Sequence, residues 1–143
     1  MTAQNYSIDD DFITLKYDGE ELDLHNNYDF VSFTHDKQNK TAECTFSKGI
    51  GDWVPEKAKN NLIIEFSNVS DVFYKSHDND YPNEYLEHDQ NCIDMIGFSY
   101  ASDEIMNGVT SSKPSNKLSS LLIVFITGKA LKIVAESSQV SVH

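Results

Sequence analysis

The longest apolar run lies near the end of the chain, and its pattern predicts a β-hairpin at the centre of the fold. Residues 121–126 are all apolar, the run breaks at Gly128-Lys129, and residues 130–135 then alternate. Branched and aromatic residues favour strands, and glycine accepts the positive φ of a tight turn. We predict a strand over 121–127 paired with residues 130–136 across Gly128-Lys129. Both of its faces should be buried, with Leu122, Val124 and Ile126 on one side and Ile123 and Phe125 on the other.

Shorter alternating segments predict further strands. Residues 12–17 and 21–24 flank Asp18-Gly19, a strong signal for a two-residue hairpin turn. Residues 28–35 predict a third strand, and residues 41–46 a fourth with Ala42, Cys44 and Phe46 on one face. Residues 62–66 and 92–100 predict buried strands, and residues 137–143 a short edge strand. Strands at this spacing indicate a mainly β fold.

The segments between the strands are polar and long. Residues 48–60 and 101–117 predict loops, and residues 67–74 a helical turn capped by Ser67 or Asn68. Residues 75–91 predict an exposed loop with a turn of helix near 84–88. We therefore expect one domain over residues 1–143, an antiparallel sandwich or strongly bent sheet with one or two short helices. A β-rich α+β fold is the alternative.

The charge narrows the choice of partners. The chain carries 23 acids and 11 bases, a formal net charge of −12, and every base is lysine. Phosphate contacts require Lys and Arg, so this balance disfavours nucleic acid as a partner. The acidity serves either solubility or a purposeful acidic face.

Membrane and export signals are not apparent in the sequence. No apolar run reaches the roughly 18–20 residues of a membrane span, and the N-terminal segment MTAQNYSIDDDF has no signal-peptide pattern. We expect a cytoplasmic protein without membrane contact. In that compartment Cys44 and Cys92 are expected to be buried free thiols rather than a disulfide or a metal pair.

Two motifs have some similarity to catalytic or metal-binding patterns. Ser99, in GFSYA, approaches the G-x-S-x-G elbow of hydrolases, but no helix pattern follows it. The acidic stretch 77–89 contains His and carboxylate residues, yet the glycine of a calcium loop and the spacing H-E-x-x-H are both absent. We therefore predict no catalytic residue, no tight metal site and no cofactor.

The candidate binding residues come from the charge map and from the single tryptophan. Trp53 lies beside Pro55 in a glycine-bearing loop and is either an exposed anchor for a partner or a lid on the edge of the core. Two acidic segments, residues 9–11 and 78–89, contain no lysine, and we predict that they form one acidic face. The predicted partner-binding residues are Asp9, Asp10, Asp11, Trp53, Asp78, Asp80, Glu84, Glu87 and Asp89.

A resemblance supports this interpretation. It lies in Trp53 and in the segments LIIEFSNV at 62–69, IGF at 96–98 and IVFITGKALKI at 123–133. In these residues the chain resembles small β-rich bacterial immunity proteins, which are encoded beside toxin domains of polymorphic and contact-dependent systems. The resemblance implies a protein that occupies a basic toxin surface and performs no chemistry. It assigns no functional residue.

Two other functions stay open. One is a small-ligand or metal-dependent enzyme whose site assembles only in three dimensions, and the other is an accessory domain whose acidity serves solubility. The sequence indicates no oligomeric state.

Overall fold

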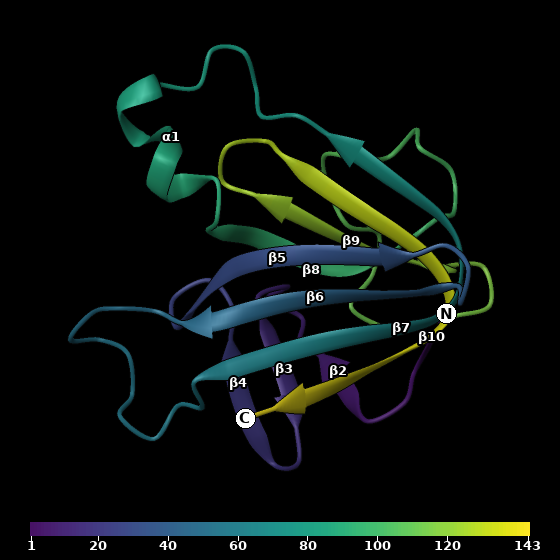
Figure 1. The fold of residues 1–143 in the computed structure, drawn as a ribbon, viewed down its shortest axis with the longest axis horizontal. Helices are drawn as coiled ribbons and strands as arrows, with labels where there is room; N and C mark the ends of the chain where they lie inside the picture. The colour runs from purple at the N-terminus through teal and green to yellow at the C-terminus, as the bar shows by residue number, and fades with distance from the viewer.

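The computed structural model describes all of residues 1–143 and consists mainly of β-strands in two sheets (Figure 1). A seven-stranded sheet, antiparallel except for its shortest strand β1, is strongly curled into a half-barrel. A second sheet has three antiparallel strands in the order β2-β3-β4. The elements are β1 (Thr2–Ala3), β2 (Tyr6–Ile8), β3 (Thr14–Tyr17), β4 (Glu20–Asp23), β5 (Tyr28–Asp36), β6 (Thr41–Lys48), β7 (Asn61–Lys75), α1 (Asn83–Asp89), β8 (Ile93–Ser99), β9 (Ser120–Phe125) and β10 (Ala130–Val142). The predicted mainly β class is confirmed, in its bent-sheet form.

The curl of the large sheet comes from two long strands, β7 and β10, of 15 and 13 residues. The first part of β7 pairs with β6 and with the end of β10, while its last part pairs only with the start of β10. The register between β7 and β10 shifts at Val134/Ala135, and Asn68 has a φ of 54°. A bulge bends a strand and increases its local twist. The sheet therefore turns sharply near the middle of both strands.

The core lies mainly on the concave side of this sheet. Twenty-five buried residues, from Met1 to Val140, form one cluster to which the small sheet contributes Leu15 and Leu22. A second, smaller cluster of Leu122, Val124 and Ala130 lies on the convex side. Met106 and Val109 pack against this cluster from the long loop between β8 and β9. The central strand is thus buried on both faces.

The predicted central hairpin is confirmed, with a correction at its turn. Strand β9 is buried along its whole length and pairs with β10 in the register Val124↔Ala130. The turn is longer than a Gly-Lys pair, because Phe125 N–H donates to the Lys129 carbonyl and Gly128 N–H to the Phe125 carbonyl. Ile126 consequently lies in the turn and is 37% exposed, not in the buried row with Val124.

Two other predictions were wrong. Residues 67–74 continue strand β7 instead of forming a helical turn, because the bulge interrupts the alternation that would have indicated a strand. Residues 137–142 are not a separate edge strand. They continue β10 and pair with β7, and the first two of them, Ser137 and Ser138, also pair with β1.

The early strands and the loops follow the prediction more closely. Asp18 and Gly19 both have positive φ at the β3-β4 turn, as the Asp-Gly signal requires. Ala42, Cys44 and Phe46 share one buried face of β6. In β5 a register shift between Phe30 and Ser32 allows Phe30 and Phe33 both to pack against the core, although strict alternation places them on opposite faces.

Candidate protein-binding surface

The acidic loop between β7 and β8 folds onto the end of the half-barrel through helix α1. The N–H of Phe30 donates to the carbonyl of Asn91 at 2.9 Å, and the N–H of Ile126 donates to the carbonyl of Cys92 at 3.1 Å. These bonds fix the residues that follow α1 against β5 and against the β9-β10 turn. The helix has only seven residues and none of them is buried. It is too short to span a bilayer.

A shallow hollow of about 460 Å³ lies between α1 and β5. Its lining includes the carboxylates of Asp29, Glu84 and Glu87, with His88 as the one basic group. Glu84 and Glu87 are three residues apart on α1 and therefore share a face of the helix. None of the three carboxylates accepts a hydrogen bond or forms an ion pair within the chain. They remain available to an external cation or donor.

Asp89, unlike its neighbours, is held within the chain. Its carboxylate accepts a hydrogen bond from the Tyr81 hydroxyl and lies 3.0 Å from His88 Nδ1. The hydrogen bond to Asp89 raises the pKa of Tyr81 to about 12, and the same carboxylate raises the pKa of His88. The bond from His88 in turn lowers the pKa of Asp89. Asp89 therefore acts mainly to secure the C-terminal end of α1.

Trp53 is exposed, so of the two alternatives for this residue the lid on the core is excluded. Its side chain lies in the loop between β6 and β7, is 69% exposed, and donates from Nε1 to the Asn26 carbonyl at 2.8 Å. The indole ring lies over Gly51, where any Cβ would collide with it. Ile50 in the same loop is 96% exposed. The ring is thus both fixed in place and presented to solvent.

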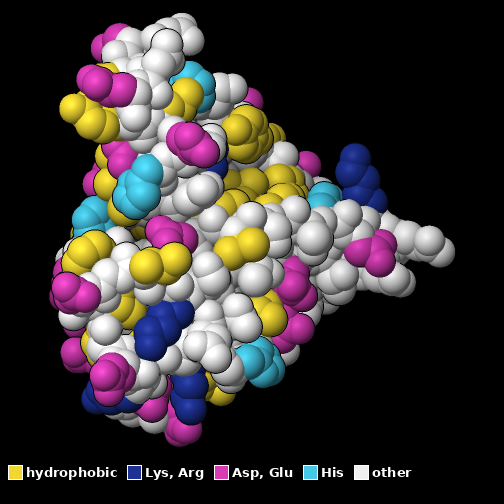
Figure 2. Space-filling model, turned by 60° about the vertical axis from the view of Figure 1, so that its left-hand side comes forward, with side chains coloured by type: hydrophobic (Ala, Val, Ile, Leu, Met, Phe, Trp, Pro, Cys, Tyr) yellow, Lys and Arg dark blue, Asp and Glu magenta, His cyan; other side chains and the backbone are white.

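The Trp53 loop and α1 lie on the same side of the molecule (Figure 1). Asn26, which holds Trp53, follows His25, and the His25 ring lies 2.5 Å from the Ile93 carbonyl just after α1. Figure 2 looks onto this side, where acidic and apolar side chains lie next to one another around the helix. Tyr85 on α1 is 56% exposed. We refer to Asp29, Trp53, Glu84, Tyr85 and Glu87 as the α1 face.

The acids of the N-terminal segment are engaged elsewhere. Asp9 forms an ion pair with Lys16 at 2.9 Å, and Asp11 accepts hydrogen bonds from the N–H groups of residues 13 and 14 and from the Thr14 hydroxyl. Asp10 accepts a hydrogen bond from the Ser112 hydroxyl at 2.6 Å. No hydrogen bond or ion pair connects these three acids with the α1 face.

Asp78 and Asp80 lie between β7 and α1. The N–H of Asp78 donates to the Thr127 carbonyl at 2.8 Å, and its carboxylate lies 3.4 Å from Lys75 Nζ. Asp80 is exposed and has no partner in the chain. Neither residue lines the hollow beside α1.

The serine, the cysteines and the potential metal ligands form no reactive cluster. Ser99 is fully buried at the end of β8, and its hydroxyl lies 3.4 Å from Thr110 Oγ1. Both cysteines are free, Cys44 fully buried and Cys92 half-buried, 4.0 Å from His25 Nδ1. Burial, reinforced by nearby carboxylates, raises the pKa of the Cys92 thiol to about 11. No group of three or more His, Cys, Asp or Glu side chains is arranged to hold a metal ion.

Comparison of the chain with protein-family models, curated proteins and solved structures finds no match.

Two members of the α1 face were not indicated by the sequence. Asp29 lies in a predicted strand, and only the docking of α1 against β5 brings it beside Glu84 and Glu87. Tyr85 lies in the segment predicted as an exposed loop with a turn of helix near 84–88, and its polarity gave no sign of a binding residue. The helical spacing of residues 84–88 was the one available signal.

Proposed function

We propose that the chain is a non-enzymatic binding protein that recognises a basic protein partner through the α1 face, as an immunity protein recognises its cognate toxin. The observation that carries this proposal is the exposed Trp53 side chain in a loop on the same side of the molecule as α1, where three unpaired carboxylates line a hollow (Figure 1). Aromatic residues dominate the binding energy of protein interfaces, and charged residues at the rim guide the partner.

The three carboxylates favour a basic partner. Asp29, Glu84 and Glu87 repel one another within the hollow, so a Lys or Arg side chain entering it gains attraction and removes that repulsion. The net charge of −12 adds a long-range field of the same sign. Electrostatically steered association reaches about 10⁸–10⁹ M⁻¹s⁻¹ at low salt.

Trp53 is placed to contribute apolar contact with the partner. Its hydrogen bond to Asn26 fixes the ring in the free protein, so little side-chain entropy remains to be lost when a partner covers it. An exposed indole buries a large apolar area on contact with a partner. The ring is therefore the expected anchor, with the carboxylates as the surrounding charged contacts.

The test is co-expression with the product of the adjacent gene, followed by measurement of association and dissociation rates. Glu84→Lys/Glu87→Lys should slow association, and its effect should shrink as salt increases. Trp53→Ala should speed dissociation and weaken binding at least about tenfold. Glu104→Lys/Glu136→Lys reverses the same number of charges at exposed positions outside the α1 face and is the matched control.

Two outcomes count against the proposal. If a complex forms but the control weakens it as much as Glu84→Lys/Glu87→Lys and Trp53→Ala has no effect, the α1 face is not the binding surface. If the neighbouring product is neither basic nor bound, the accessory-domain alternative replaces the immunity function.

A further inference from the structure

The second half of β7 is an open edge of the large sheet. Strand β6 pairs with β7 only as far as Ser67, and the Val69 N–H donates to the Lys40 carbonyl at 2.8 Å. Beyond this point the tip of the β5-β6 hairpin ends. Residues 71–75 then pair with β10 alone, and their remaining backbone groups have no hydrogen bond to any other part of the chain.

The antiparallel pattern shows which backbone groups point outward. Phe125 N–H donates to the Lys129 carbonyl, so the backbone N–H and C=O groups of Lys129 point towards β9. Because these groups alternate in direction along an antiparallel strand, those of residues 131 and 133 also point towards β9. Residues 130, 132 and 134 therefore face β7, where they pair with Lys75, Phe73 and Asp71. The outward-facing residues of β7 are consequently Val72 and Tyr74.

We propose that a second copy of this chain pairs with this edge, β7 to β7 and antiparallel, on a two-fold axis through Phe73. In this register Val72 of one copy lies opposite Tyr74 of the other, and their outward N–H and C=O groups can form four backbone hydrogen bonds. If the second strand slides by two residues, only one of the outward-facing residues keeps a partner: either Val72 lies opposite Val72 of the other copy, or Tyr74 lies opposite Tyr74. The register centred on Phe73 alone uses both.

Charge complementarity favours the same register. It places Asp71 of each copy opposite Lys75 of the other, on the face of the sheet that also carries Phe73. Asp71 is exposed and has no hydrogen bond or ion pair within the chain, and Lys75 has only the 3.4 Å contact with Asp78. Directly opposite pairs of unlike charge stabilise neighbouring strands, whereas pairs of like charge destabilise them.

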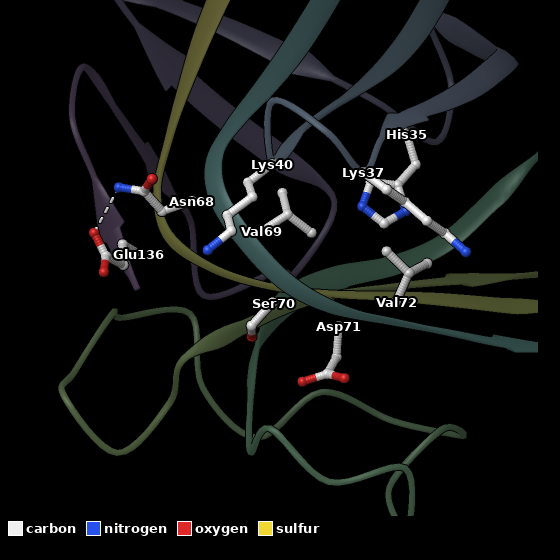
Figure 3. Close-up of a pocket in the computed structure, with 9 residues that line it drawn as sticks. All are labelled: His35, Lys37, Lys40, Asn68, Val69, Ser70, Asp71, Val72 and Glu136. Carbon is white, nitrogen blue, oxygen red and sulfur yellow. Dashed lines mark hydrogen bonds between the residues drawn. The ribbon is translucent and has the colours of Figure 1, made fainter.

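The edge has the space that a partner strand needs. An open groove of about 920 Å³ lies along residues 68–72 of β7, with His35, Lys37 and Lys40 of the β5-β6 hairpin on its other side (Figure 3). In the register centred on Phe73 the incoming strand lies opposite residues 71–75, so it ends before Val69, where Lys40 occupies the neighbouring position. Tyr74 is 66% exposed and would be covered. The product is one continuous sheet to which each copy contributes β7, β10, β9 and β8.

The β7 edge is a different surface from the α1 face, and pairing there does not depend on the α1 face. The two respond to salt in opposite directions. Two copies of net charge −12 repel one another over long distances, so added salt should strengthen self-association. Binding of a basic partner should weaken under the same change.

The test is analytical ultracentrifugation of the purified chain across a wide range of concentration and salt. We expect a concentration-dependent shift from 16.2 kDa towards twice that mass, strongest at high salt. Tyr74→Pro removes an outward N–H without removing one from the β7-β10 ladder, and should weaken association at least about tenfold. Tyr74→Ala keeps the N–H and is its matched control. Circular dichroism confirms that each variant is folded.

Charge exchange tests the register. Asp71→Lys and Lys75→Asp should each weaken the dimer, and the double variant Asp71→Lys/Lys75→Asp should restore it. A chain that stays monomeric at the highest concentration and salt overturns the proposal. So does a dimer that Tyr74→Pro leaves intact. If the single charge variants dimerise like the parent chain, the register is wrong. If an unrelated extended peptide binds this edge more tightly than a second copy does, the proposal that the edge binds a second copy is wrong.

Discussion

At the scale of single residues, an aromatic cluster packs between β5, β6 and the end of β9. Phe125 lies 5.1 Å from Phe30, ring centre to ring centre, and Phe30 lies 5.5 Å from Phe46, both pairs edge to face. Lys129 places its ammonium 4.1 Å from the centre of the Phe125 ring. Burial lowers the pKa of Lys129, and the ring faces supply part of the electrostatic stabilisation that water would otherwise give. These contacts fasten the β9-β10 turn to β5.

We predict that Phe125→Ala lowers the free energy of unfolding by about 3–5 kcal/mol, because the side chain is only 1% exposed and its removal leaves a cavity. Chemical denaturation of the purified variant measures this loss. Ile126→Ala is the control in the next position. Ile126 is 37% exposed, so its truncation should cost about 1 kcal/mol or less. Equal losses in the two variants would contradict the assigned burial of β9.

Lys132 shows how a single charged residue can organise a loop. Its side chain is fully buried on the convex face, where Nζ donates to the Ser102 carbonyl at 2.6 Å. Burial lowers the pKa of Lys132, which nearby Asp103 partly offsets. The bond connects β10 with the loop between β8 and β9, the same loop that covers Leu122 and Val124. Lys132 therefore helps to keep the convex face of the central strands closed.

At the scale of elements, the two hairpin turns depend on glycine for different reasons. Gly19 and Gly128 both have positive φ, 77° and 84°. A Cβ on Gly19 would meet nothing within 4 Å, whereas a Cβ on Gly128 would collide with the Asp78 carboxylate. Asp78 is held there by the bond from its N–H to Thr127. The β9-β10 turn is thus packed against the loop that leads to α1.

This difference gives a matched pair of variants. Gly19→Ala should cost about 1–2 kcal/mol through backbone strain alone. Gly128→Ala carries the same strain and must also displace Asp78, so its loss should be larger by about 1 kcal/mol or more. Thermal and chemical denaturation of both variants measure the difference. A Gly128→Ala loss no larger than that of Gly19→Ala would show that the Asp78 contact does not constrain the turn.

The sequence predicted those elements whose signals are local. The Asp18-Gly19 turn, the apolar run of β9 and the alternation of residues 42, 44 and 46 each report on their immediate neighbours, and each is confirmed. Long-range features left no such signal. The bulges in β5 and β7 break the alternation from which strands are recognised, and the burial of Lys132 depends on a loop that arrives from far along the chain.

The candidate surface also depends on contacts between residues that are far apart in the sequence. The exposure of Trp53 could not be predicted from its neighbours, because the ring is held by the carbonyl of Asn26, 27 residues away. The charge map of the sequence grouped Asp9, Asp10 and Asp11 with the acids near α1. The number of acids in a segment does not indicate where their side chains point in the fold. In the structure Asp9 pairs with Lys16, Asp10 accepts a hydrogen bond from Ser112, and Asp11 accepts one from Thr14.

At the scale of the whole molecule, repulsion between acids outweighs attraction. The chain has 23 acids, and only two lysine ion pairs, Lys16–Asp9 and Lys75–Asp78, offset them, with His88–Asp89 as a third when His88 is protonated. The folded state concentrates this charge on a compact surface, whereas the unfolded chain disperses it. Net charge far from zero therefore lowers the stability of the compact state through self-repulsion.

We predict that salt stabilises the isolated chain at neutral pH. Raising ionic strength from about 0.01 M to about 0.15 M shortens the screening length from about 30 Å to about 8 Å, so repulsion between distant acids falls. The melting temperature should rise by about 3–5 °C, as expected for about 1 kcal/mol in a domain of this size. The control is the same salt series near the sequence pI of about 4.6, where the net charge is close to zero and the increase should largely disappear. An equal increase at both pH values would mean that salt acts on hydration instead of charge. A melting temperature that falls with salt at neutral pH would mean that the few ion pairs outweigh the repulsion, because screening would then remove a net attraction.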